Sequence, residues 1–218
     1  MTALVFLLLI ILSANTVFAY NLELGKSRIS PASPFYFLKS AREALEIKFA
    51  GTTHIRALYK MEFANRRVRE VNSLIQTPQE DLIQPTLEKY WSLMQELKGI
   101  TSLSNQDMAK RVSGGAVSQM SDLQENYSKA SDPKAKRSIR THIHRLSEWE
   151  QDLIDKLDLI EPAMPALIAE IAASKLSACY FLSQEASAAA LNEVEKEVFA
   201  TRSKKCFLNL RPVSRSRD

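Results

Sequence analysis

Apolar residues recur every three or four positions along most of the chain, and charged residues fill the positions between them. Within residues 54–76 the apolar positions alternate by four and three, which is the spacing of a seam between antiparallel helices. Segments 78–98, 105–129 and 133–160 carry stripes of similar spacing. The pattern therefore predicts a series of amphipathic helices that pack side by side. The predicted stripes are Ala57, Met61, Ala64, Val68, Val71 and Ile75; Ile83, Leu87, Tyr90, Met94 and Leu97; Met108, Val112, Ala116, Met120, Leu123 and Tyr127; and Ile139, Ile143, Leu146, Leu153, Leu157 and Ile160.

Short polar segments and helix breakers separate these stripes. A first helix is predicted over residues 34–50, and the glycine after it suits a C-terminal cap. Thr77-Pro78-Gln79-Glu80 is typical of a helix start, because it places a cap, a proline and a glutamate in their preferred positions. A last helical region over residues 163–201 is rich in Ala and Ser, and we expect it to divide at Ser183 or Ser187.

The fold class predicted from these elements is all-α: an elongated antiparallel bundle of about six to seven helices after an N-terminal signal segment. Only five Gly and eight Pro are present, which argues against an all-β or loop-rich chain. Gly114-Gly115 lies inside a stripe and indicates a weak point or a close helix contact. No sequence repeat is evident. The expected organisation is a signal peptide (1–19), a linker (20–30), a helical bundle domain (31–160), a C-terminal helical hairpin or arm (161–210) and a disordered tail (211–218).

The stretch Pro31–Phe49 opens the predicted bundle and places four large apolar side chains, Phe35–Leu38, in one helical turn. Four consecutive residues cannot share one stripe of a helix, so we expect this turn to be wedged between several packing partners. The stripe that follows consists of Leu38, Ala41, Leu45 and Phe49.

This opening also carries a family resemblance. Ser33–Lys39, which reads Ser-Pro-Phe-Tyr-Phe-Leu-Lys, and the amphipathic helix after it resemble the start of a bacterial family known as the domain of unknown function 5667. Its members typically open with a proline, an aromatic pair and Leu-Lys, followed by a second helix rich in Arg and Glu, and Tyr59–Val71 is similar to that helix. The resemblance covers residues 31–75 and implies an exported or membrane-tethered helical module. It supplies no catalytic residues.

Ala3–Ala19 has the pattern of a secretory signal, with an apolar run and small residues before a cleavage site. We expect cleavage after Ala19 and a secreted, periplasmic or cell-surface protein. No Lys or Arg precedes the apolar run, whereas Lys26 and Arg28 follow it. If the segment is retained, it anchors the chain in a membrane as its one expected membrane contact, and the positive-inside rule favours a cytoplasmic body.

Cys179 and Cys206 are the two cysteines of the chain. In an exported protein they can form one disulfide, and the alternative is two unpaired thiols. On one unbroken helix they would lie about 40 Å apart. Pairing therefore requires the chain to turn back between them, or two molecules to pair.

The charge pattern argues against a nucleic-acid partner. The net charge is +4, and Lys and Arg are interspersed with Asp and Glu along the whole chain. A basic stripe on the second predicted helix could hold phosphate or anionic lipid. Its acids lie within pairing distance of the bases, so we favour a solvated outer face for this basic side. That side consists of Arg56, Lys60, Arg66, Arg67 and Arg69.

Candidate metal ligands are few. His142 and His144 point to different sides of a helix, whereas His144 and Glu148 share a face. A metal site would need at least one more ligand, so we expect surface imidazoles that pair with glutamates, and neither a metal nor a cofactor. Glu150 occupies an apolar position, where burial would raise its pKa, but we favour partial exposure or an arginine partner.

The sequence contains no nucleophile elbow, no Cys-His pairing and no phosphate-binding loop. We therefore expect no catalytic residues and predict an exported, non-enzymatic interaction or scaffold module. Its expected partner is a protein, bound by burial of apolar side chains on a helix face or in a groove, and self-association into a homo-oligomer is a further expectation. The alternatives are an extracytoplasmic metal or ligand sensor that uses His142 and His144, and a membrane-anchored regulatory domain.

Overall fold

The computed structural model describes residues 29–77, 79–100, 106–158, 165–187 and 191–209. The predicted signal segment, most of the linker and the predicted tail lie outside these ranges. The described residues contain seven α-helices, one short 3₁₀ turn and no strand, which confirms the all-α prediction. The elements are α2 (Tyr36–Lys48), α3 (Thr53–Ile75), η1 (Glu80–Leu82), α4 (Ile83–Ile100), α5 (Gln106–Lys129), α6 (Pro133–Asp158), α7 (Pro165–Ala186) and α8 (Glu193–Leu208).

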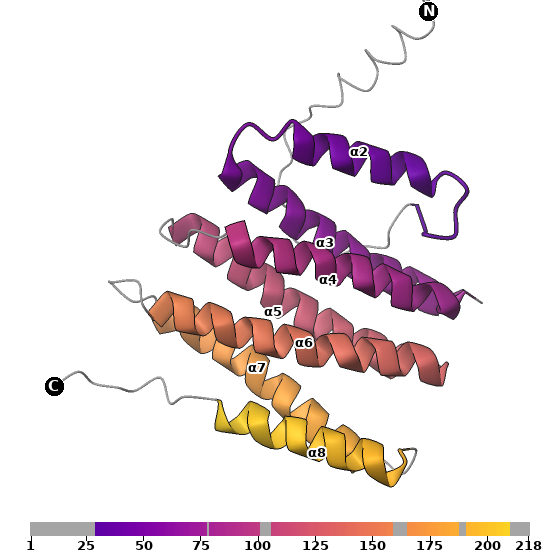
Figure 1. Ribbon diagram of the computed structural model, residues 1–218, viewed down its shortest axis with the longest axis vertical. Coiled ribbons are helices and arrows are strands. Elements are labelled where there is room, and N and C mark those ends of the chain that lie inside the picture. The colour runs from indigo at the N-terminus through magenta and orange to yellow at the C-terminus, as the bar shows by residue number, and fades with distance from the viewer. Residues whose placement is uncertain (1–28, 78, 101–105, 159–164, 188–190, 210–218) are drawn as a thin grey trace, which may run out of the picture.

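Helices α3 to α8 form three hairpins that stack along the long axis of the molecule (Figure 1). In each hairpin, α3, α5 or α7 pairs with the helix that follows it. The first helices of the hairpins lie side by side in one layer, and α4, α6 and α8 lie in the other. Helix α2 lies at one end of the stack and packs mainly against α3.

Contacts between hairpins follow a regular offset along the chain. Asn126 of α5 donates to the Val68 carbonyl of α3, 58 residues earlier, and Tyr127 bonds Glu185 of α7, 58 residues later. The fold is therefore a structural repeat of helical hairpins, although no repeat is visible in the sequence. Each hairpin buries its apolar stripes against the next, as in other stacked helical arrays.

The predicted stripes form the core of this stack. All five stripe positions of α4 are fully buried, and so are nearly all of those on α3, α5 and α6. Ile75 and Tyr127 are half-buried at the rim, and Ile160 lies outside the described residues. The paired glycines mark a close helix contact at Gly115, where an added Cβ would lie 2.7 Å from the Met61 sulfur.

The predicted start of the third helix is wrong. Residues 80–82 form the 3₁₀ turn, and the regular helix α4 begins only after it. The Thr77 hydroxyl donates to a carbonyl at the end of α3 over 3.0 Å instead of capping α4. The Glu80 carboxylate accepts from the Asp132 backbone N–H at 2.8 Å and from the Ser131 hydroxyl at 2.9 Å. The glutamate therefore serves the start of α6, a partner that local sequence does not reveal.

The last helical region folds as a hairpin. Helix α7 runs through Ser183 and ends beside Ser187, so the second of the two predicted division points is the nearer one. Asn192 and Glu195 form a capping box that begins α8, which extends to Leu208. The turn brings the Cα atoms of the two cysteines to 5.5 Å, and a disulfide joins Cys179 to Cys206.

This disulfide is a principal attachment of α8. The buried residues of α8 are few, namely Phe199, Ser203 and Cys206. At the start of α8 an ion pair joins Glu195 to Arg137 of α6 at 2.8 Å, and near the other end the cross-link joins the helix to α7. Loss of the disulfide should therefore release α8 before the rest of the stack.

We predict that replacing both cysteines by serine lowers the free energy of unfolding by about 2–4 kcal/mol, because the unfolded chain regains the freedom of a closed loop. Denaturant unfolding measures this loss, and hydrogen exchange should show the fastest amides in α8. The variant should be insensitive to reductant, which lowers the stability of the natural chain. Equal stability of the two proteins would contradict the prediction.

Candidate functional site

Helix α2 packs with its polar side toward the bundle. Tyr36, Lys39 and Glu43 face α3, and Glu43 is the one residue of α2 that is fully buried. Most of the large apolar side chains of α2 and of its two flanking residues point away from the bundle. The exposed ones are Phe35, Phe37, Leu38, Leu45 and Phe49. The prediction that the first turn is wedged between packing partners is therefore wrong.

A polar network fixes α2 to α3. The Tyr36 hydroxyl donates to Glu70 Oε2 at 2.9 Å, and Lys39 Nζ lies 2.5 Å from Glu70 Oε1. Arg67 donates to both Glu70 oxygens, at 2.7 and 2.6 Å, and also to Glu43 and the Tyr36 hydroxyl. We call these five residues the α2–α3 network; its central carboxylate, that of Glu70, is fully buried.

The charges of this network support one another. Burial disfavours the charged form of Arg67, but the carboxylates of Glu70 and Glu43 outweigh it and raise the pKa of the guanidinium. Burial raises the pKa of the Tyr36 phenol, so the hydroxyl stays protonated and acts as a donor. Burial raises the pKa of Glu43, and the facing Arg67 opposes that rise. The network is thus an ionic cluster sealed between two helices.

The predicted solvated basic side of α3 needs correction. Lys60 and Arg67 are buried, the first beside Glu96 of α4 and the second beneath α2. Arg66 does pair with Glu62 of its own helix, at 3.0 Å, as the spacing suggested. The difference arises because α2 and α4 cover parts of a surface that the sequence alone leaves open.

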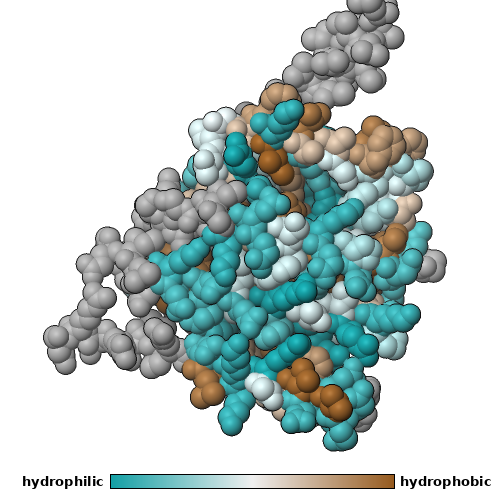
Figure 2. All heavy atoms as spheres, viewed as in Figure 1, coloured by the Kyte–Doolittle hydropathy of each residue, from teal (hydrophilic) through white to brown (hydrophobic). Residues whose placement is uncertain are grey.

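The outer side of α2 is an exposed apolar face. Leu38, Ala41, Leu45 and Phe49 follow one another at helical spacing, so they form a single stripe. Their large side chains remain 54%, 48% and 76% exposed at Leu38, Leu45 and Phe49. Figure 2 shows hydrophobic residues gathered at the end of the molecule where α2 lies. We call this stripe, with Phe35 and Phe37 on its flanks, the outer face of α2.

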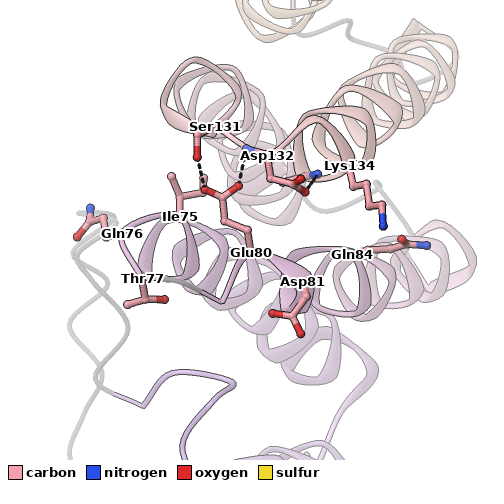
Figure 3. Close-up of a pocket in the computed structure, with 10 residues that line it drawn as sticks. Ile75, Gln76, Thr77, Glu80, Asp81, Gln84, Ser131, Asp132 and Lys134 are labelled. Carbon is pink, nitrogen blue, oxygen red and sulfur yellow. Dashed lines mark hydrogen bonds between the residues drawn. The ribbon is translucent and has the colours of Figure 1, made fainter.

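A groove of about 810 Å³ lies where the end of α3 and η1 meet the start of α6 (Figure 3). Its acidic groups have structural partners. Glu80 points to Ser131 and Asp132, whereas Asp81 points away from them. Asp132 in turn accepts from the backbone N–H of Ala135 at 2.8 Å. The groove is therefore a capping junction between two hairpins and lacks a pair of carboxylates poised for chemistry.

The two histidines of α6 are not brought together. His142 is buried, with Nδ1 2.9 Å from the Ser138 carbonyl, so the prediction of a surface imidazole is wrong there. Burial lowers the pKa of His142. His144 lies 3.7 Å from Glu148, as predicted. Among the described residues, no group of three His, Cys, Asp or Glu side chains is placed to hold a metal ion.

Among the carboxylates of the described residues, Glu150 has the pKa that is raised most. It is fully buried, and its Oε1 accepts from the Ser174 hydroxyl at 2.6 Å. Burial raises the pKa of Glu150 to about 8, against opposing contributions from Ser174 and Lys175. The favoured interpretation, exposure or an arginine partner, is wrong. The group links α6 to α7 inside the stack.

Helix α7 is, within the described part of the chain, the one helix whose length and apolar content would suit a membrane span. It packs against α5, α6 and α8 and carries one half of the disulfide. Its inward positions, including Leu182 and Lys175, are buried inside the stack. These contacts identify α7 as a core helix of this fold.

The α2–α3 network was not predicted from the sequence. The sequence does contain the pattern for it: Tyr36, Lys39 and Glu43 recur at spacings of three and four on the side of the helix opposite the apolar stripe. Arg67 and Glu70, three apart, form a matching polar patch on α3. The usual assignment of the apolar side to the core concealed this match.

We predict that Arg67→Ala detaches α2, because it leaves two buried carboxylates without their shared cation. Breaking a buried ion pair in this way costs about 3 kcal/mol or more. Hydrogen exchange of the α2 amides measures the detachment. The control is Arg42→Ala, which removes a partly exposed pair with Glu46 and should cost less than about 1 kcal/mol. Equal protection of α2 in both variants would refute the anchoring role of Arg67.

We predict that Glu150→Gln removes a pH dependence of stability. The natural carboxyl, whose pKa rises from 4.5 to about 8 on folding, holds its proton in the folded state while the unfolded state releases it. Stability should therefore fall as the pH rises from about 4.5 toward 8, by at most about 1.4 kcal/mol per pH unit. Denaturant unfolding across this range should show a smaller decline in the glutamine variant. Parallel pH profiles would contradict the assignment.

The comparisons with known proteins bear on this geometry. The sequence model of a family described as a domain of unknown function (DUF5667) matches residues 28–199. This match is wider than the resemblance over residues 31–75 and includes α2, the first two hairpins, α7 and the first part of α8. No curated protein and no solved structure matches the chain significantly. Because the match spans well over half of the sequence, the chain belongs to the DUF5667 family.

Proposed function

We propose that this chain is an exported, non-enzymatic interaction module and that the outer face of α2 is its contact surface. The supporting observation is that the polar side of α2 is bound to α3 while its apolar stripe is exposed. Exposed apolar surface of this kind marks interaction sites in soluble proteins. The α2–α3 network gives the exposure a structural cause, because α2 cannot turn its stripe inward without removing Glu43 from Arg67.

The stacked hairpins suit a scaffold. Their apolar stripes form one continuous core that runs from α3 to α7, so the platform beneath α2 is rigid. Trp149 of α6 donates to the Met94 carbonyl of α4 at 3.2 Å and ties neighbouring hairpins together. A rigid support lets a partner bind α2 without ordering the rest of the chain, which favours affinity.

Two features support export. Ala3–Ala19 has the pattern of a secretory signal. The disulfide between Cys179 and Cys206 is of a kind that persists in oxidising compartments. Neither feature depends on α2, so the compartment and the contact surface are independent parts of the proposal.

The positions of the two histidines do not favour the sensor alternative. His142 would have to leave its contacts with Ser138 and Arg145 before it could bind an ion. His144 already lies beside Glu148. In the described part of the chain, no contact places the two imidazoles so that they could bind one ion.

Photo-crosslinking tests the contact surface. We expect p-benzoylphenylalanine in place of Leu45 to give a discrete adduct on irradiation in the producing cells, because position 45 lies at the centre of the outer face. The control is the same label at Val194, an apolar residue of α8 that is 72% exposed at the other end of the stack. The label reacts with both protein and lipid. Absence of an adduct at position 45, or the same adducts at both positions, would overturn the proposal.

A further inference from the structure

We propose that the outer face of α2 docks on a lipid bilayer that contains anionic headgroups. In this arrangement α2 lies in the plane of the interface, with its apolar stripe at the acyl boundary and the hairpin stack directed away from the membrane. The inference rests on the proposed function, because it assigns an occupant to the same contact surface. Four observations on the shape, charge, orientation and sequence context of α2 support it.

The shape of the outer face suits a flat surface. Its stripe runs through Leu38, Ala41, Leu45 and Phe49 along most of α2, which is about 17 Å at 1.5 Å per residue. The flanking Phe35 and Phe37 widen the apolar arc to about 160° of the helix circumference. A helix bound in a protein groove typically relies on a narrow row of anchors. A broad arc along the whole helix is instead typical of an interfacial helix.

The charges around the stripe suit anionic headgroups. At 3.6 residues per turn, Arg42 and Lys48 fall on opposite sides of the stripe, and both side chains are exposed. Long basic side chains in these positions reach toward headgroups while the apolar residues between them enter the membrane. Glu43 is turned inward to Arg67, and Arg42 pairs with Glu46 at 2.6 Å, so the pair adds no net charge and Lys48 gives the outward side its net charge of about +1. The outward charge of α2 is therefore positive.

The α2–α3 network sets the orientation. It holds Tyr36, Lys39 and Glu43 against α3, so the opposite side of α2 is directed outward at the end of the stack (Figure 1). A planar surface can meet this end of the molecule along the length of α2. A recessed helix could not make such a contact.

The sequence before α2 also favours a position near a membrane. The apolar segment Ala3–Ala19 precedes Tyr36 by a short tether that includes Lys26 and Arg28. During export, or for as long as that segment is retained, the chain is already at a membrane.

Vesicle co-sedimentation tests the inference with the chain that starts at Tyr20, so that Ala3–Ala19 cannot cause binding. All the described contacts lie beyond residue 28 and are kept in this chain. We expect binding to vesicles of phosphatidylcholine with about one-third phosphatidylglycerol to exceed binding to pure phosphatidylcholine by about five- to thirtyfold at low salt, given one or two effective cations. Added salt should reduce this preference.

Two matched variants assign the binding to the outer face. Phe49→Glu changes a residue that is 76% exposed on α2 and should reduce vesicle binding at least about tenfold, because a charge would enter the interface. Val194→Glu changes a residue that is 72% exposed on α8 and should leave binding unchanged. The double variant Arg42→Gln, Lys48→Gln should lose the preference for anionic vesicles. Circular dichroism melting checks that each variant remains folded.

The complete chain provides a second measurement. With p-benzoylphenylalanine at position 45, irradiation in the same anionic vesicles should give a lipid adduct, and the label at position 194 should give none. Lack of vesicle binding, or binding that Phe49→Glu leaves unchanged, would overturn the inference. A protein adduct at position 45 in cells, without vesicle binding, would contradict the lipid inference but would agree with the proposed function. A dimer that Phe49→Glu dissociates, without vesicle binding, would replace the bilayer by a second copy.

Discussion

The orientation of α2 depends on one buried cation. Arg67 lies between Glu43 of α2 and Glu70 of its own helix, and the Tyr36 hydroxyl completes the contact. Hydrophobic burial alone would turn the apolar stripe of α2 toward α3, because that orientation removes more apolar surface from water. The network reverses this preference: two carboxylates that have lost their water require the guanidinium. The molecule thereby keeps an apolar helix face in solvent.

Buried ionic groups of this kind determine which side of a helix faces its neighbour, whereas their net effect on the free energy of unfolding is small. Taking Arg67 and its partners out of water carries a cost that their mutual attraction only offsets. Turning the other side of α2 toward α3 would separate Glu43 from Arg67 and Lys39 from Glu70. Glu150 shows the contrasting case, in which a buried carboxylate without a facing guanidinium keeps its proton. The same residue type thus acts as an anchor on α2 and as a neutral hydrogen-bonding group on α6.

Much of the fold was predictable because the buried side of each helix follows from the spacing of apolar residues within that helix. The stripe of α4, from Ile83 to Leu97, was read directly from spacings of three and four and is entirely buried. Contacts between residues of different hairpins were not predictable from the sequence. Glu80 has the spacing of a capping glutamate for its own helix, yet it binds the start of α6, 52 residues away. His142 is buried because α4 covers a side of α6 that no pattern in α6 itself identifies.

The sequence by itself determined the helices, the seams between them and the membership in a helical family, since these follow from periodicity and from short motifs within single segments. Only the tertiary structure decided which side of α2 faces the bundle, and with it the candidate contact surface. The physical reason is that an amphipathic helix has two usable sides. The choice between them depends on whether a distant residue, here Arg67, offers the polar side a charged partner.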